Sequence, residues 1–308
     1  MSFSLQLSKP INSPTIGFAK ELSMPLGKND SEIDIKIHYT DEGSGEPLIL
    51  VHSFGQSLYT WHGIVEGLSS KYRVIAIDLI GHGYSSAPQY CSYSIDNQAD
   101  MIIQLMKKLN IGSAHFVGFS QGCAVIARLA AEHPTKVSRI IMLSPGGITP
   151  MMPTLLKAFE SAFFGALASV FVNQTTIASM LQECFLDLTL VNDQMIEQYS
   201  KTLEIPENKR AARLFASSFD EKQFTEDLMT ISSPVLILMS SDDKWRSIEQ
   251  VQEYFNLIKN ASSSQIRNAG HLMHEEQPSK IIASVLSFID ADNSIDDDKN
   301  QDSTNEQQ

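Results

Sequence analysis

The stretch of sequence that decides the fold reads Ala114-His115-Phe116-Val117-Gly118-Phe119-Ser120-Gln121-Gly122-Cys123-Ala124-Val125-Ile126-Ala127. An apolar run ends in Gly-x-Ser-x-Gly, and a small-residue run with helical character follows at once. This order is typical of a strand that turns sharply into a helix, because the glycines let the backbone fold back without a Cβ clash. The hydroxyl of Ser120 is then exposed above the strand end, and N–H groups at the helix start face any oxyanion formed there. Ser120 is therefore our candidate nucleophile.

The length and composition of the chain suit one large α/β domain with an insertion, or two modest domains. It has 308 residues, 43% of them hydrophobic, and a formal net charge of −13. The acidic excess argues against nucleic acid or an anionic membrane as a partner. No run approaches the roughly 18 apolar residues of a membrane span, and the N-terminus lacks the apolar core of a signal peptide. We therefore expect a cytoplasmic protein.

Strand and helix patterns alternate along the first half of the chain. Residues 33–39 alternate apolar and polar side chains, whereas residues 47–51 and 72–78 are almost continuously apolar. Turn residues at 41–45 predict a hairpin between the first two of these strands. The alternation as a whole predicts a mostly parallel sheet with helices on both faces. The carboxyl ends of its strands share one edge, where we expect Ser120 and the loops after residues 51 and 78.

The chain divides into four parts on its sequence pattern. We interpret residues 1–30 as an N-terminal extension with an edge strand around Ile16–Met24, and residues 31–146 and 231–290 as the α/β core. Residues 147–230 are helix-rich without a clear strand, which predicts a helical cap above the strand ends. Residues 291–308 are acidic and polar, which predicts a disordered tail.

The insertion carries two groups of residues that bear on the site. Some of its Met and Phe side chains are predicted to roof an apolar acyl cavity; they are Met151, Met152, Phe159, Phe163, Phe164 and Phe171. Its basic residues predict a solvated face, with a docking surface for an acidic substrate carrier as the alternative; they are Lys157, Lys201, Lys209, Arg210 and Arg213.

Five motifs follow one another in chain order. They are His52-Ser53-Phe54-Gly55, Asp78-x-x-Gly81-His82-Gly83-x-Ser85, Gly118-x-Ser120-x-Gly122, Asp242-Asp243 and Gly270-His271-x-x-x-x-Glu276-x-Pro278. Together they closely resemble the α/β-hydrolase superfamily, in its cap-bearing serine esterase and lipase-like branch. The resemblance runs from about Glu32 to Ile289 and is weakest across the insertion. It implies an α/β-hydrolase fold, a mostly parallel sheet with a helical cap insertion.

The resemblance also implies a catalytic triad. A serine needs an adjacent general base, and His271 follows the nucleophile in the chain order Ser…Asp…His. The acid that orients the imidazole is expected after the strand at residues 235–239. The strand–Gly–x–x–Asp pattern of the family favours Asp243, although Ser240 stands in place of the glycine, and Asp242 is the alternative.

Backbone N–H groups near Ser120 are predicted to form an oxyanion hole. One donor is the N–H of Gln121, the residue after the nucleophile, and the other, by resemblance, is the N–H of Phe54. The resemblance gives the turn around His82 a structural role. His274 and Glu275 lack metal-ligand spacing, so we expect neither a metal nor a cofactor.

The function predicted on this basis is hydrolysis of a small to medium carboxylic ester or thioester through an acyl-enzyme on Ser120. One alternative is a C–C bond hydrolase of ring-cleavage products that uses the same triad. Another is a ligand receptor on a hydrolase scaffold with slow or absent turnover.

Overall fold

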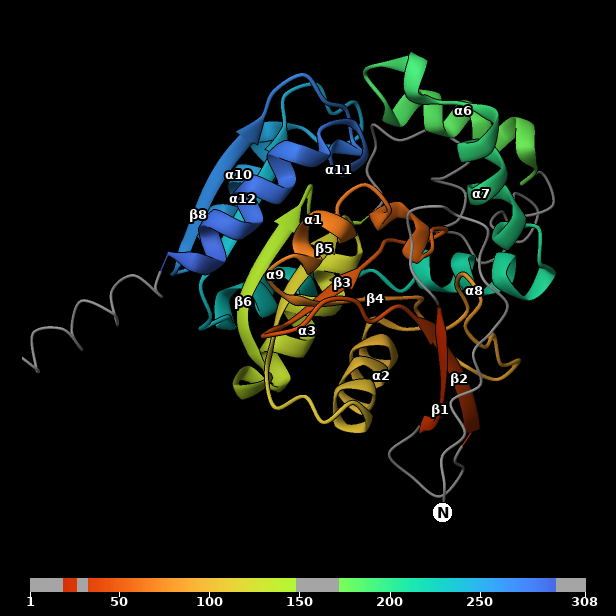
Figure 1. Cartoon of the computed structure of the whole chain (residues 1–308), viewed down its shortest axis with the longest axis horizontal. Helices are drawn as coiled ribbons and strands as arrows, with labels where there is room; N and C mark the ends of the chain where they lie inside the picture. The colour runs from red at the N-terminus through yellow and green to blue at the C-terminus, as the bar shows by residue number, and fades with distance from the viewer. Residues whose placement is uncertain (1–18, 27–32, 148–171, 292–308) are drawn as a thin grey trace, which may run out of the picture.

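An eight-stranded sheet forms the centre of this computed structural model, which describes residues 19–26, 33–147 and 172–291 (Figure 1). The sheet order is β1-β2-β4-β3-β5-β6-β7-β8, with antiparallel pairing of β1, β2 and β4 and parallel pairing from β4 to β8. The strands are β1 (Lys20–Leu26), β2 (Ile33–Tyr39), β3 (Pro47–Val51), β4 (Arg73–Ile77), β5 (Ala114–Phe119), β6 (Val137–Leu143), β7 (Val235–Ser240) and β8 (Ala261–Ile266). The predicted mostly parallel sheet is thereby confirmed.

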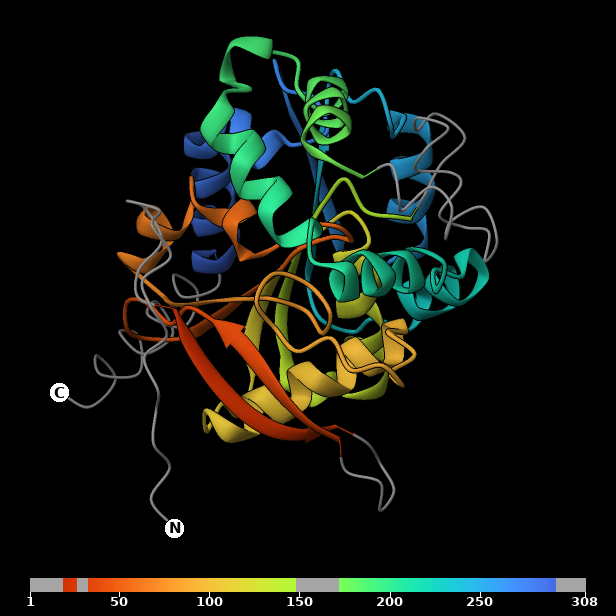
Figure 2. The ribbon, with the colours of Figure 1, turned by 90° about the vertical axis from the view of Figure 1, so that its right-hand side faces the viewer.

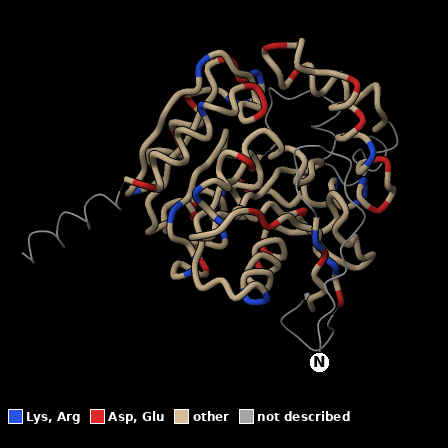
Figure 3. Tube along the Cα trace, in the orientation of Figure 1, with Lys and Arg blue, Asp and Glu red and all other residues tan. Residues whose placement is uncertain are grey.

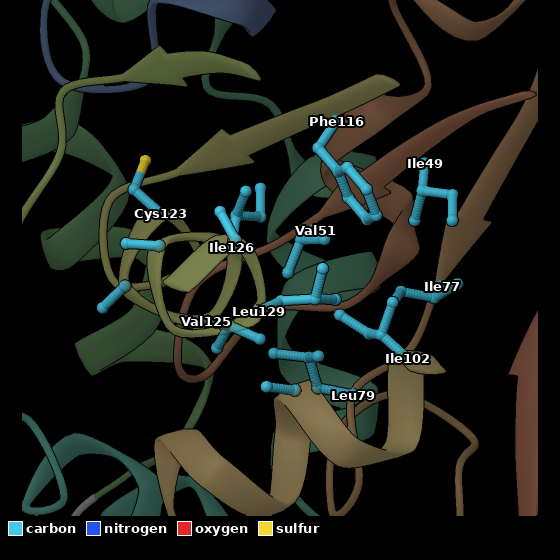
Figure 4. Close-up of a cluster of buried hydrophobic side chains, with 14 of the residues drawn as sticks. Ile49, Val51, Ile77, Leu79, Ile102, Phe116, Cys123, Val125, Ile126 and Leu129 are labelled. Carbon is cyan, nitrogen blue, oxygen red and sulfur yellow. The ribbon is translucent and has the colours of Figure 1, made fainter. Parts of the chain in front are cut away.

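Helices cover both faces of the sheet, and each face has its own apolar core. One core includes residues of α2 (Ile95–Lys108), α3 (Gly122–Glu132), α9 (Glu221–Thr230) and α10 (Ile248–Leu257). The other includes residues of α1 (Val65–Ser69) and α12 (Pro278–Asp290). In Figure 4, Ile126 and Leu129 of α3 and Ile102 of α2 pack toward Val51 and Phe116 of the sheet.

The sequence explains the position of these elements. Strands β3, β5 and β7 carry no charged residue, as expected of strands buried on both faces, and the charges drawn in Figure 3 lie mostly on outer helices and loops. Helix α2 begins where Ser94 caps it, since the Ser94 side chain accepts a hydrogen bond from the N–H of Asn97. No helix in the described ranges is long and apolar enough to cross a membrane.

The predicted hairpin between residues 33–39 and 47–51 is wrong. Strand β4 lies between β2 and β3, and Glu42 pairs with Val74 of β4 through two backbone hydrogen bonds. The turn at Gly43 instead crosses closely over the loop before β4, where a Cβ would lie 2.4 Å from the carbonyl oxygens of Ser69 and Tyr72. The turn residues at 41–45 correctly predict that the chain turns there. They cannot show that β4, which begins 30 residues after Gly43, lies between the two strands.

Helices from the described residues between 174 and 216 gather beyond the carboxyl ends of the strands (Figure 2). They are α6 (Gln174–Cys184), α7 (Asp193–Leu203) and α8 (Pro206–Ala216). Helix α9 contacts both α3 and α10, and all three helices contribute to the core on one face of the sheet. The division of the chain into extension, core, cap and tail stays a prediction, and the Met and Phe residues between 151 and 171 lie outside the described residues.

Candidate active site

Ser120 occupies a tight turn between β5 and α3. Its φ angle is +50°, a conformation that costs a non-glycine residue energy and is common at functional sites. Both glycines of the motif are needed for close packing. A Cβ at Gly118 would lie 2.6 Å from Ile126, and one at Gly122 would lie 2.4 Å from the carbonyl oxygen of Val51. The start of α3 is therefore pressed against the end of β3.

Asp243 and His271 meet in the loops that follow β7 and β8. The Oδ2 atom of Asp243 lies 2.7 Å from Nδ1 of His271 and accepts a hydrogen bond from the Ser144 hydroxyl at 3.0 Å. Its Oδ1 atom accepts from the backbone N–H groups of Trp245 and Arg246, at 2.8 and 3.0 Å. Burial alone would raise the pKa of Asp243, but the facing imidazole and these hydrogen bonds hold it below its usual value. The carboxylate is thus kept ionised beside His271.

The neighbouring Asp242 lies elsewhere. It is exposed, and its carboxylate accepts a hydrogen bond from the Ser241 hydroxyl. Of the two adjacent aspartates, the structure places Asp243 against the histidine. The His271 ring is also packed between aromatic rings, with the centroid of Phe119 at 4.9 Å and that of Trp245 at 5.1 Å.

Ser120 and His271 line the same cavity. The Ser120 hydroxyl donates a hydrogen bond to the carbonyl of Gly146 at 3.4 Å, and Nε2 of His271 has no hydrogen-bond partner among the described residues. In ligand-free enzymes the hydrogen bond between nucleophile and base is often long and tightens only on substrate binding.

The two predicted oxyanion donors lie beside Ser120. Phe54 lines the cavity, and its N–H has no hydrogen-bond partner within the described part of the chain. The N–H of Gln121 points to the hydroxyl oxygen of Ser53 at 3.3 Å. The Gln121 side chain donates to the carbonyl of Phe215 in α8 at 2.6 Å. The residue after the nucleophile thus contacts both the loop after β3 and a helix above the site.

Glu276 explains the spacing of the last motif. Its Oε1 atom accepts from the backbone N–H groups of Leu186 and Asp187 at 2.8 and 2.9 Å, and its Oε2 atom accepts from the N–H of Gly270. A Cβ at Gly270 would lie 2.3 Å from the carbonyl oxygen of Cys184. The loop that carries His271 is therefore fastened to the chain that leaves α6.

The cavity is mostly apolar and opens to solvent, and about 870 Å³ of empty space, open solvent included, lies between its lining atoms. Its apolar wall comes from the helices above the sheet; the residues are Ile177, Met180, Leu181, Leu203 and Ala212. None of these side chains was singled out from the sequence, because helical spacing does not tell whether a face turns to a cavity or to another helix.

Two of the basic residues predicted to form a solvated face are only partly exposed. Lys209 lines the cavity, and its Nζ donates to the carbonyl of Val172 at 2.7 Å. Arg210 donates to the carbonyls of Gln89 and Pro88, at 2.6 and 3.0 Å. Both side chains fold back onto the protein because backbone carbonyls are within their reach.

A buried polar cluster joins α7 to the loop after His271. The carboxylate of Glu275 accepts hydrogen bonds from the hydroxyls of Tyr199 and Thr60, and Nε2 of His274 lies 2.8 Å from the Thr60 hydroxyl. Burial raises the pKa of Glu275 to about 7 and lowers that of His274 to about 3. His274 and Glu275 are thus held by hydrogen bonds within this buried cluster.

Asp78 and His82 lie outside the cavity lining, in buried contacts of their own. Asp78 binds the His38 ring at 2.6 Å and the N–H groups of Leu58 and Tyr84, and Nδ1 of His82 lies 3.1 Å from the carbonyl of Ile80. Within the described ranges, the acidic and histidine side chains close enough to share a metal ion are Asp100, Glu132 and His133, which do not line the cavity.

The comparisons with known proteins agree with this fold. The family model described as alpha/beta hydrolase fold matches residues 46–278, and the chain belongs to this family. The (E)-2-((N-methylformamido)methylene)succinate hydrolase of Acinetobacter baylyi is 23% identical over 255 residues, 82% of this chain and 94% of that protein.

Two solved structures with the same fold are similar to this chain. A meta-cleavage product hydrolase from Pseudomonas fluorescens superposes with a TM-score of 0.72 at 24% identity, over 83% of this chain and 95% of that one. The carboxylesterase CesB from Bacillus subtilis superposes with a TM-score of 0.71 at 20% identity, over 87% and 91%. The proteins that this chain resembles thus include a carboxylesterase and a meta-cleavage product hydrolase.

Proposed function

We propose that this protein is a serine hydrolase that cleaves a carboxylic ester or thioester of a small to medium acyl substrate. The observation that carries the proposal is the 2.7 Å contact between Asp243 and Nδ1 of His271, at a cavity that Ser120 also lines. A carboxylate that accepts the Nδ1 proton leaves the lone pair on Nε2, the nitrogen that takes the serine proton.

The reaction then has two halves. Oγ of Ser120 bonds to the carbonyl carbon while its proton passes to Nε2 of His271, and the oxyanion is stabilised by the N–H groups of Gln121 and Phe54. His271 returns the proton to the leaving oxygen or sulfur as that bond to carbon breaks. Water next attacks the acyl-enzyme by the same route and releases the acid and free Ser120.

The test is a panel of p-nitrophenyl esters of graded chain length, together with a fluorophosphonate probe. We expect kcat/KM to rise from acetate toward medium chains, since each buried methylene adds about 0.8 kcal/mol of binding until the cavity is full. Ser120→Ala should abolish turnover and labelling without changing the circular dichroism spectrum.

The other outcomes point to definite alternatives. Labelling that persists in Ser120→Ala would place the nucleophile elsewhere. Turnover of a ring-cleavage product but of no ester would favour the C–C bond hydrolase. A wild-type protein that binds these compounds without turning over any of them would favour the receptor.

A further inference from the structure

Lys209 introduces a positive charge into an otherwise apolar wall. It lies on α8 near Ala212, with Leu203 of α7 and Val172 also in the lining. Among the described residues that line the cavity, Lys209 is the only Lys, Arg, Asp or Glu. Lys209 thus lines the same cavity as Ser120 and His271.

The ammonium group has little to bind in its surroundings. It donates one hydrogen bond, to the carbonyl of Val172, and no Asp or Glu within the described ranges lies at ion-pair distance from it. A lysine ammonium carries three N–H donors. Lys209 is half-buried, so its charge is only partly hydrated. A cation in this position attracts an anion more strongly than one on the open surface does.

Its neighbours along the chain show a contrast. The guanidinium of Arg210 is turned away from the cavity, toward the carbonyls of Gln89 and Pro88 and the ring of Tyr93. Lys222 on α9 is exposed and lies 3.7 Å from Glu226. Lys209 therefore differs from Arg210 in lining the apolar cavity, and from Lys222 in having no carboxylate at ion-pair distance among the described residues.

We propose that Lys209 binds a carboxylate of the substrate, so that the preferred substrates are anionic esters. This inference rests on the proposed function for the identity of the scissile bond. The apolar wall accepts the hydrocarbon part of such a molecule, and Lys209 pairs with the carboxylate remote from the reacting carbonyl. The carboxylate belongs either to the acyl chain, as in a monoester of a dicarboxylic acid, or to the alcohol.

Binding is measured first in Ser120→Ala, so that the result does not depend on turnover. The ligands are the p-nitrophenyl monoester of adipic acid and its neutral methyl-capped form, with 4-carboxyphenyl and phenyl hexanoate as the pair that carries the charge on the alcohol. The readout is isothermal titration calorimetry. A hydrogen bond between charged groups corresponds to about a 10- to 100-fold difference in Kd. We expect one anionic ligand to bind more tightly than its neutral partner by this factor.

The same ligands are then titrated into three further variants of Ser120→Ala. Adding Lys209→Met should abolish the preference for the anion and leave the Kd of the neutral ester unchanged, whereas Lys209→Arg should retain most of the preference. Adding Lys201→Met, on α7 outside the cavity lining, is the matched control and should change neither Kd.

Two results would overturn the inference. One is equal binding of charged and neutral ligands to Ser120→Ala in both pairs. The other is a loss of affinity in Lys209→Met that is the same for both members of a pair, which would mean that Lys209 only secures the chain at Val172. Failure of the proposed function is seen separately, as wild-type protein that binds these esters but does not hydrolyse them or react with fluorophosphonate.

Discussion

Asp243 and His271 lie 2.7 Å apart although 28 residues separate them in the chain. Each follows a strand of the parallel pair β7 and β8, in which Ser240 is the register partner of Ile266. Two loops that leave neighbouring strands at the same edge are brought together by the sheet itself. The contact therefore depends on strand register as much as on the loops.

Asp243→Asn should lower kcat for ester hydrolysis by about 10⁴, because the amide no longer holds the imidazole in the tautomer that accepts the serine proton. Asp242→Asn is the matched control and should change kcat less than about threefold, since Asp242 is exposed and its carboxylate accepts a hydrogen bond from its neighbour Ser241. Steady-state kinetics on one ester suffices. A large loss in Asp242→Asn with Asp243→Asn active would reverse the assignment.

Ser53→Ala should raise kcat/KM by about two- to tenfold. The Ser53 hydroxyl accepts a hydrogen bond from the N–H of Gln121, and a neutral hydrogen bond of this kind is worth about 0.5 to 1.5 kcal/mol. Without the hydroxyl, the N–H of Gln121 can bind the oxyanion without first breaking this hydrogen bond. If the variant is slower than wild type on all esters, the Ser53 hydroxyl itself stabilises the oxyanion and our interpretation of it is wrong.

Gly122→Ala should destabilise the fold by about 3 kcal/mol or more. The new Cβ would lie 2.4 Å from the carbonyl oxygen of Val51 and 2.6 Å from that of His52, and neither backbone group can move away cheaply. Gly112→Ala is the matched control, because a Cβ there has no atom within 4 Å, and its effect should stay within about 1 kcal/mol. Urea unfolding of both variants provides the comparison; equal midpoints would contradict the packing argument.

Glu275→Gln should make the protein less sensitive to pH. Burial raises the pKa of Glu275 from 4.5 to about 7, so in this range the folded chain keeps a proton that the unfolded chain releases. The free energy of unfolding contributed by this carboxyl therefore falls as the pH rises from about 4.5 to 7. Above about pH 7 that contribution stays constant. Glutamine can still accept hydrogen bonds from Tyr199 and Thr60 but does not ionise.

The quantity to measure is the free energy of unfolding of Glu275→Gln minus that of wild type. It should increase by about 2 to 3 kcal/mol between pH 5 and pH 8. Glu204→Gln, at an exposed position just after α7, is a suitable control and should show no such trend. A difference for Glu275→Gln that does not vary with pH would mean that the carboxyl is already ionised in the folded protein at pH 5.

The sequence predicted the sheet well and the cavity poorly, for a physical reason. Continuous apolar runs such as residues 47–51 have one stable location, the interior of a parallel sheet, and the residues that follow them must then share an edge. The family resemblance supplied Asp243 and His271 as partners for Ser120, and the shared sheet edge is the reason that the structure brings the three residues to one region. A turn such as residues 41–45, however, holds no information about a strand that inserts from elsewhere.

The walls of the cavity depend on how whole helices are rotated. Lys209 looks like any surface lysine in the sequence, and only the packing of α8 turns it inward. The Ser53 hydroxyl became relevant in the same way, once the turn at Ser120 directed the N–H of Gln121 toward it. Ser53 and Gln121 are 68 positions apart, and Lys209 and Val172 are 37 apart, so no local pattern could predict these contacts.

The attachment of Glu276 to Gly270 and to the chain after α6 has a consequence for how the histidine loop tolerates change. Two acidic residues hold the histidine loop in different ways. Glu276 accepts hydrogen bonds from the main chain beside His271, whereas Asp243 contacts the His271 ring. A variant without Asp243 thus keeps the main chain beside His271 anchored but loses the group that orients the ring, whereas a variant without Glu276 keeps that group but loses the main-chain anchor. An added small-molecule base can therefore restore activity to a variant without Asp243 but not to a variant without Glu276.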